Sequence, residues 1–314
     1  MADSLPPQTV GLLGYGEVGQ ILAEDLRARD VQVLAYDVKL DTPETALVLR
    51  AHAESHGVKL CASAADLAGQ SELLVCAVTA SQAIAAARAA AAGLSAGSDY
   101  LDFNSASPGA KRQAALLVEA RGAHYVEAAV MTSVPPYRIK VPMLLGGPHA
   151  ARLANKISPL GFFGRVASER LGVASATKMC RSVIIKGMEA MMIESLSAAR
   201  HYGVEDAVLA SLAETFPGVD WERQATYFFQ RVIEHGRRRS EEMIESAQTV
   251  SEAGLSPHSA LGTAQRQGWV ADLADAEVFG SRGSAGFARS ADWRVEADRL
   301  LLRVRQCLTD SPQR

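Results

Sequence analysis

Three glycines near the amino terminus have the spacing of a phosphate-binding turn. Gly14, Gly16 and Gly19 follow an apolar run and open a helical pattern. In such a turn the first glycine permits the tight bend, the second lets the backbone approach a pyrophosphate, and the third lets the helix pack against the strand. The first-turn amides, beginning at Glu17 and Val18, then face the phosphates together with the helix dipole. The segment predicts a dinucleotide site at these five residues.

A carboxylate stands at the end of the next predicted strand. Asp37 lies about twenty residues beyond the glycine turn, where such folds place the group that binds the ribose hydroxyls. Its charge would repel a 2′-phosphate, which favours NAD, whereas the nearby Lys39 could admit NADP. An ordinary turn role for Asp37, and a site for S-adenosylmethionine, remain alternatives at this point.

Two later predicted strands end in residues that could reach the same ligand. Val78 and Thr79 close one apolar run, and Asn104 and Ser105 follow another. Ligands of open α/β folds bind beyond the carboxyl ends of the strands. We therefore expect Val78, Thr79 and Asn104 to contact the cofactor and Ser105 to contact substrate or nicotinamide. The alternative for Asn104 and Ser105 is that they only cap turns.

The order of predicted elements places these residues in an α/β domain. Apolar runs at 9–13, 32–36, 73–78, 100–103 and 125–130 alternate with helical patterns at 17–29, 43–56, 81–92 and 111–121. Such alternation predicts a Rossmann domain with a doubly wound, mostly parallel sheet, over residues 1–168.

Beyond about residue 170 the strand signals stop. Helical patterns follow at 175–201, 206–214, 220–233, 240–253, 259–271 and 291–308. The first of these is long and apolar around most of its circumference, which is typical of a helix buried between domains or subunits. We expect residues 169–314 to form an all-helical domain for substrate binding and dimerisation.

Composition excludes several other classes. The chain has 314 residues, 21% of them charged, and a formal net charge of −3, so no overall field favours nucleic acid or an anionic membrane. Cys61, Cys76, Cys180 and Cys307 lack metal-binding spacing, so we expect free thiols and no metal site. The amino-terminal residues lack the basic and apolar regions of a secretory signal, and no apolar run is long enough to span a membrane. We expect a cytoplasmic protein.

Several segments, taken together, resemble the β-hydroxyacid dehydrogenase and 6-phosphogluconate dehydrogenase superfamily. Residues 11–19 resemble its GFIGLGxMG opening, and Asp102-Phe-Asn-Ser-Ala-Ser-Pro resembles its DxST-x-SP segment. Residues 126–133 stand where the family has DAPVSGG, the loop for the substrate carboxylate, and residues 144–148 resemble the VGG that ends the first domain. Residues 172–180 resemble the catalytic-lysine segment. That segment, with 239–245 and 254–257, looks closest to a bacterial branch with a DUF1932-type carboxyl-terminal domain.

The resemblance implies roles for individual residues. Lys178 matches the general acid/base, and Ser182 stands where the family usually has asparagine. Thr132 and Ser133 match the carboxylate loop, although the family has glycines there, and Arg238 lies where a later helix approaches the substrate. Another departure is Glu241, where the family often has lysine. Because these departures fall in the substrate pocket, we expect cofactor and reaction type to carry over better than the substrate.

The function expected from these observations is an NAD(P)-dependent oxidoreductase. It would transfer a hydride between nicotinamide and a small 3-hydroxy acid or related β-hydroxy carbonyl compound, with the small hydroxy or keto acid as its partner and Lys178 as general acid/base. An imine reductase and a phosphogluconate-type oxidative decarboxylase are alternatives within the enzyme class. A non-catalytic dinucleotide-binding regulatory protein is an alternative of another class. The resemblance also implies a homodimer.

Overall fold

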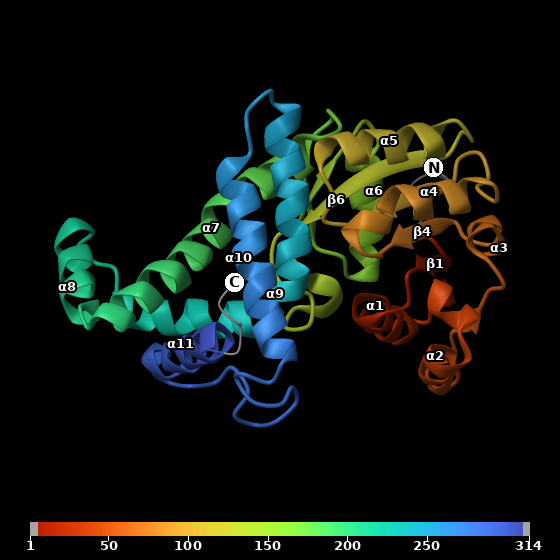
Figure 1. Cartoon of the computed structure of the whole chain (residues 1–314). Helices are drawn as coiled ribbons and strands as arrows, with labels where there is room; N and C mark the ends of the chain where they lie inside the picture. The colour runs from red at the N-terminus through yellow and green to blue at the C-terminus, as the bar shows by residue number, and fades with distance from the viewer. Residues whose placement is uncertain (1–5, 310–314) are drawn as a thin grey trace. The chain divides into compact units, whose positions relative to one another are not determined.

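The structure, a computed structural model, describes residues 6–309 and divides into two units, Met1–Cys180 and Arg181–Arg314 (Figure 1). The first five residues lie outside the described part, so the expectation that they do not form a signal peptide is untested. The side chain of Cys307 lies outside it as well. Cys61, Cys76 and Cys180 are free thiols. Within the described residues, no helix is long and apolar enough to cross a membrane.

The first unit is built on one eight-stranded sheet of order β3-β2-β1-β4-β5-β6-β7-β8. Neighbouring strands run parallel except β6 and β7, which pair antiparallel. Buried apolar runs form the central strands because helices cover both of their faces. The strand bounds are β1 Thr9–Leu13, β2 Gln32–Tyr36, β3 Lys59–Leu60, β4 Leu73–Cys76, β5 Asp99–Asp102, β6 His124–Val130, β7 Met143–Gly146 and β8 Gly164–Ser168.

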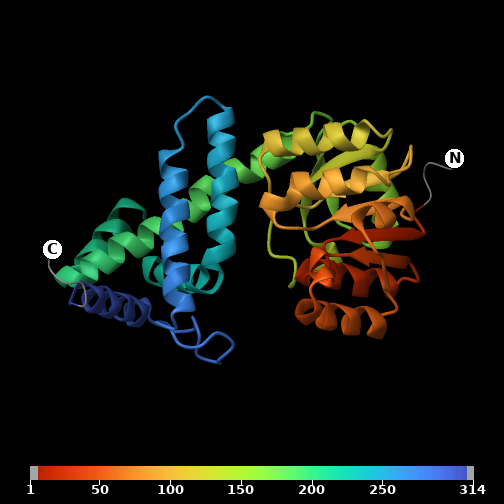
Figure 2. The same ribbon diagram turned by 45° about the vertical axis from the view of Figure 1, so that its right-hand side comes forward.

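Helices pack on both faces of this sheet (Figure 2). Helices α1 (Glu17–Arg27), α2 (Pro43–Ser55) and α6 (Ala150–Ile157) bury their apolar residues in one core. Helices α3 (Ala64–Gly69), α4 (Ala83–Ala91) and α5 (Pro108–Glu119) contribute to the other. The short 3-10 helices of this unit are η2 Val38–Asp41, η3 Ala80–Gln82, η4 Arg138–Lys140 and η5 Ser158–Leu160. The predicted Rossmann architecture is confirmed.

The described part of the second unit consists of helices and the loops that connect them, with no strand. Helix α7 (Val173–Tyr202) begins in the first unit and continues into the second, followed by α8 (Glu205–Thr215), α9 (Trp221–Glu252), α10 (His258–Asp275) and α11 (Trp293–Thr309). Helices α9 and α10 form a hairpin and lie side by side in both views (Figures 1 and 2). The predicted all-helical second part is confirmed.

The break predicted between residues 233 and 240 is wrong, because α9 runs through it. Gly236, which lies in this stretch, lets α10 approach closely: a Cβ there would lie 2.7 Å from the carbonyl oxygen of Gln267. One turn later, the guanidinium of Arg239 binds the carboxylate of Glu189 in the interior of the unit. Close helix packing and a buried ion pair therefore keep this stretch helical.

Candidate active site

The carboxyl ends of four parallel strands gather the predicted cofactor residues along one edge of the sheet. In register, Leu13 of β1 pairs with Tyr36 of β2 on one side and with Cys76 of β4 on the other, and Cys76 pairs with Asp102 of β5. The residues that follow these strand ends therefore lie next to one another. Backbone hydrogen bonds continue the pattern, since Gly14 N donates to Tyr36 O at 2.9 Å.

The glycine turn has the geometry that a dinucleotide pyrophosphate requires. Gly14 has φ +98°, and a Cβ there would lie 2.5 Å from the carbonyl oxygen of Ala77. At Gly19 a Cβ would lie 2.2 Å from the carbonyl oxygen of Gly14. A Cβ at Gly16, by contrast, would meet no atom of the described residues within 4 Å. The turn is therefore packed at its two outer glycines and open at the middle one, where a phosphate would approach.

Helix α1 begins at this turn with its amide groups available for an anion. Gly16 is its N-cap, and no side chain of the described residues caps the first turn. The exposed Glu17 and the half-buried Val18 are the first two helical residues. An uncapped helix start that follows an open glycine is a suitable anion site, because its orphan amides and dipole favour negative charge. The residues present fit a dinucleotide.

Asp37 connects the end of β2 to the glycine turn. Its carboxylate accepts one hydrogen bond from the Tyr15 amide at 2.8 Å and another from the Lys39 amide at 2.9 Å. The carboxylate thus fixes the backbone of the turn from the side where a ribose is expected. Lys39 itself is exposed beside it. That Asp37 also supports the turn could not be inferred from the sequence.

Asn104 holds two strand ends together. Its side chain is buried, its Oδ1 accepts a hydrogen bond from the Val78 amide at 2.8 Å, and its Nδ2 lies 3.3 Å from the Cys76 sulfur. Burial raises the pKa of the Cys76 thiol to about 12, so this cysteine is not a nucleophile at neutral pH. Val78 is half-buried and Thr79 exposed at the same edge. Contact of Asn104 with the cofactor stays a prediction.

A buried polar cluster lies beneath Asn104. The carboxylate of Asp102 accepts hydrogen bonds from the Asn104 amide at 2.9 Å and the Tyr125 hydroxyl at 2.6 Å, and it pairs with Lys111 Nζ at 2.9 Å. Burial raises the pKa of Tyr125 well above its ordinary value, so the phenol stays a hydrogen-bond donor. Because every partner is buried, the cluster fixes the loop that carries Ser105.

Lys178 lies beside Ser105 within the first unit. Lys178 Nζ donates a hydrogen bond to Ser105 Oγ at 2.5 Å, and both residues are half-buried. The structure therefore brings together the amine predicted to move the proton and the hydroxyl predicted to touch the substrate. Ser105 comes directly after Asn104, at the strand edge that also carries the glycine turn.

A buried carboxylate holds the start of the helix that carries Lys178. Glu127 of β6 is 0% exposed and accepts hydrogen bonds from the amides of Gly172 at 2.7 Å, Ala174 at 3.1 Å and Ser175 at 3.3 Å. A Cβ at Gly146 would lie 2.4 Å from a Glu127 oxygen, so this glycine leaves the space for the carboxylate. Sequence reasoning missed this cap, although a single carboxylate in an apolar strand was a visible signal.

The predicted substrate loop follows β6. Thr132 is exposed and Ser133 half-buried. Farther along this loop, Arg138, with φ +53°, anchors it to helix α1 through Glu24 at 2.6 Å and Asp25 at 2.9 Å. No sequence pattern indicates this contact. It fixes the loop behind Thr132 and Ser133, whose role with a carboxylate stays a prediction.

The remaining predicted site residues belong to the second unit. Ser182 of α7 is buried, whereas Arg238 of α9 is exposed over 55% of its side chain and lies 3.7 Å from Glu242. In the interior of this unit, Glu189 binds Arg239 and also accepts a hydrogen bond from Gln267 at 3.3 Å. Glu189 therefore has a structural partner, and substrate contacts of Ser182 and Arg238 stay predictions.

Known families match both parts of the chain. Residues 9–156 match the NAD binding domain of 6-phosphogluconate dehydrogenase, and residues 199–270 match DUF1932, a domain of unknown function. A conserved hypothetical protein from Sinorhizobium meliloti 1021 is 33% identical over 96% of this chain and 99% of its own, with a TM-score of 0.76. A conserved protein of unknown function, MTH1747, described as structurally similar to 3-hydroxyacid dehydrogenases, is 30% identical over 85% of this chain and 99% of its own, with a TM-score of 0.65.

More distant enzymes share the fold. A 3-hydroxyisobutyrate dehydrogenase from Mycobacterium tuberculosis, solved with L-serine, is 17% identical over 93% of this chain and 99% of its own, with a TM-score of 0.64. The two-part family match and the full-length relatives agree with the glycine turn and strand edge described above. The chain therefore belongs to the family that joins a 6-phosphogluconate dehydrogenase-type NAD-binding domain to a DUF1932 carboxyl-terminal domain, with structural similarity to 3-hydroxyacid dehydrogenases.

Proposed function

We propose that the protein is an NAD(P)-dependent oxidoreductase that transfers a hydride between nicotinamide and a small 3-hydroxy acid or related β-hydroxy carbonyl compound. The observation that carries this proposal is the hydrogen bond between Lys178 Nζ and Ser105 Oγ. This hydrogen bond brings an amine next to a hydroxyl at the strand edge where the glycine turn also lies. An oxidoreductase of this kind needs such a proton-transfer group next to the substrate alcohol.

The nicotinamide, when bound, supplies the hydride acceptor or donor. In the oxidative direction, the neutral Lys178 amine takes the proton of the substrate hydroxyl as the carbon gives up its hydride. In reduction, the ammonium returns that proton to the carbonyl oxygen. Ser105 orients the amine and hydrogen-bonds the same substrate oxygen. Glu127 acts through the backbone, since it holds the first turn of α7 and hence the position of Lys178.

NAD is the proposed cofactor, although the fold accommodates either dinucleotide. The Asp37 carboxylate at the end of β2 places negative charge where the 2′-phosphate of NADP would lie. Lys39 is exposed and reduces this preference without cancelling it, because a solvated lysine is a weak electrostatic partner. The substrate is proposed to be an acid because Thr132 and Ser133 offer hydroxyl and amide donors to a carboxylate.

To test this proposal, a set of 3-hydroxy acids is incubated with the protein and either NAD or NADP. Formation of the reduced cofactor is followed by absorbance. For a substrate that turns over, Lys178→Ala is expected to lower turnover at least about a hundredfold while the dinucleotide still binds, because a general acid/base is lost. Lys59→Ala is the matched control, since Lys59 is an exposed lysine of the same unit. Full turnover in Lys178→Ala would refute the assignment. Dinucleotide binding without turnover of any such acid would favour the non-catalytic alternative.

We also propose that the protein is a homodimer formed through the helical unit. Helix α7 leaves large apolar side chains exposed there, including Ile184 at 64% and Met191 at 63%. Exposed apolar side chains on a helix favour association with another surface. Light scattering coupled to gel filtration tests this directly. A monomer across the micromolar range would contradict it.

A further inference from the structure

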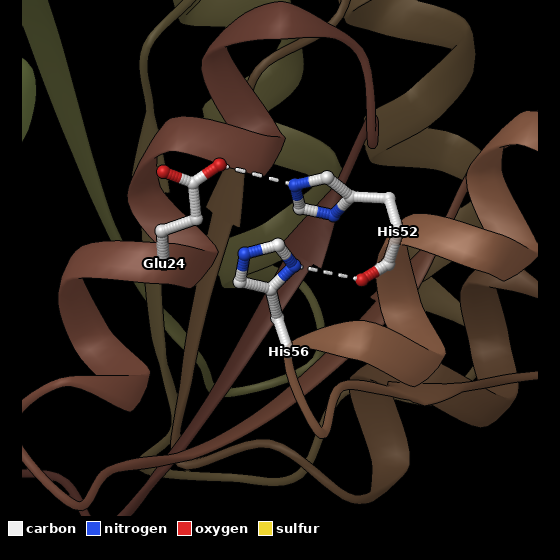
Figure 3. Close-up of side chains that lie close together, drawn as sticks. All are labelled: Glu24, His52 and His56. Atoms are coloured by element: carbon white, nitrogen blue, oxygen red, sulfur yellow. Dashed lines mark hydrogen bonds and ion pairs between the residues drawn. The ribbon is translucent and has the colours of Figure 1, made fainter.

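Three potential metal ligands lie together on the first unit, in a cluster that contacts Tyr15 of the glycine turn through His52. Glu24 comes from α1, His52 from α2, and His56 follows the end of α2 (Figure 3). One ligand atom from each lies within 4.8 Å of the other two. The two histidines are four residues apart, which brings them to one side of the helix end. The neighbouring helix supplies the carboxylate.

In each of these three residues, the atom that would not bind a metal already has a partner. His52 Nδ1 lies 2.8 Å from the Tyr15 hydroxyl, and Glu24 Oε2 accepts from Arg138 at 2.6 Å. His56 Nδ1 lies 2.9 Å from the carbonyl oxygen of His52 and 2.9 Å from Ser55 Oγ. In the tautomer that donates to this carbonyl oxygen, Nδ1 carries the proton. The other nitrogen of His56, Nε2, therefore has its lone pair available.

The remaining atoms face one another. His52 Nε2 lies 3.1 Å from Glu24 Oε1, and Figure 3 shows the second nitrogen of the His56 ring on the side of Glu24. Metal-binding histidines usually donate their second ring nitrogen to a carbonyl or similar acceptor, and ligating carboxylates are themselves hydrogen-bonded. His56 and Glu24 already have this arrangement.

The distances suit a tetrahedral ion. Bonds of about 2.0–2.1 Å separate neighbouring ligands by about 3.3 Å, close to the 3.1 Å between His52 Nε2 and Glu24 Oε1. The other two separations, at most 4.8 Å, need to shorten by no more than about 1.5 Å. His56 can supply this movement because it lies at the helix end. Glu24 and His52 are partly exposed, at 33% and 16% of their side chains, so an ion and a water ligand can reach them.

We propose that Glu24, His52 and His56 form a binding site for a divalent transition metal of the zinc class. Two imidazoles and one carboxylate select zinc, cobalt or nickel over magnesium and calcium. Binding requires the proton on His52 Nε2 to move to Nδ1, which then donates to the Tyr15 oxygen. Tyr15 lies inside the glycine turn, so an occupied site would reinforce the packing behind that turn.

The test is metal binding by the full-length chain without an affinity tag. Zn²⁺ is measured by competition with a chromogenic chelator, and Co²⁺ by its visible absorption, which reports tetrahedral coordination. We expect one ion per chain in the wild type. His56→Gln and Glu24→Gln are each expected to lower affinity at least about a hundredfold, and Tyr15→Phe about tenfold, as for loss of an outer hydrogen-bond partner.

His149→Gln is the matched control. His52 and His56 form a close ring pair, with centroids 4.2 Å apart, and so do His124 and His149, at 4.4 Å. In the second pair, the neighbouring Asp99 carboxylate is paired with Arg152 and Lys156. This variant should bind zinc as the wild type does. The proposal is overturned if the wild type binds neither ion, or if folded His56→Gln binds with unchanged affinity. Because His56 lies at the helix end, we expect its replacement to leave the fold intact. Circular dichroism checks this for each variant.

Discussion

Replacing Glu127 by glutamine gives the sharpest test of how the lysine is positioned. The carboxylate is fully buried and accepts from three amides at the start of α7, at 2.7, 3.1 and 3.3 Å. Glutamine has the same shape, but it removes the charge from the positive end of the helix and turns an NH₂ group toward one of the amides. Loss of the charge–dipole term, up to about 2 kcal/mol, and of hydrogen bonds to a charged acceptor gives a total of about 2–4 kcal/mol.

The loss of this stabilising free energy can be measured as faster hydrogen exchange of the three amides. The amides of Gly172, Ala174 and Ser175 should exchange with solvent about 30- to 900-fold faster in Glu127→Gln, since each 1.36 kcal/mol is about a factor of ten. Hydrogen exchange followed by NMR measures this, with the exposed Glu119→Gln of the same unit as control. Turnover should fall with dinucleotide affinity nearly unchanged. Unchanged exchange at the three amides would show that Glu127 does not hold the start of α7.

Three further predictions concern the cofactor turn and the pH dependence of stability. Gly16→Ala should leave the melting temperature within a few degrees of wild type but weaken dinucleotide binding at least about tenfold. Gly19→Ala, by contrast, should destabilise the fold by about 1–3 kcal/mol, because its Cβ would overlap a carbonyl. Isothermal titration and thermal melts distinguish the two variants, and equal effects would contradict the open turn. Asp37→Asn should raise the KM for NAD more than that for NADP, and steady-state kinetics showing equal changes would argue against a ribose contact. Burial lowers the pKa of His149 below 6.5. The free energy of unfolding should therefore fall as pH drops from about 6.5 toward the folded-state pKa, because the unfolded state binds the proton first. In urea titrations, His149→Gln should reduce this dependence of unfolding free energy on pH, and an unchanged slope would refute the role of His149.

The central strands and the glycine turn could be predicted from the sequence because their signals are local. The runs predicted at 9–13 and 32–36 coincide with β1 and β2. They are apolar, short, and bounded by residues that end strands. Strand β3 has only two residues, and β8 is largely exposed, so neither shows the apolar run of a buried strand. Strand β7 has only four residues, and its sequence stands out only through its resemblance to the family's VGG segment.

The parts of the site that sequence reasoning missed depend on contacts between distant residues. Glu127 binds an amide 45 positions away, and Arg138 binds Asp25 across 113 positions. No periodicity or spacing reveals such pairs, because they arise only when the sheet brings its edges together. The charge of Glu127 in an apolar strand showed that a partner was needed, but not which one. For the same reason, the sequence did not reveal that Glu24 lies close to His52 and His56.

A crystal structure of the protein with NAD bound would show whether the glycine turn and Lys178 act on the same dinucleotide. We predict that the pyrophosphate contacts the amides that follow Gly16 and that the nicotinamide lies beside Ser105, with Lys178 Nζ directed to the face where a substrate alcohol would bind. A dinucleotide bound elsewhere, or a nicotinamide ring remote from Lys178 Nζ, would contradict it.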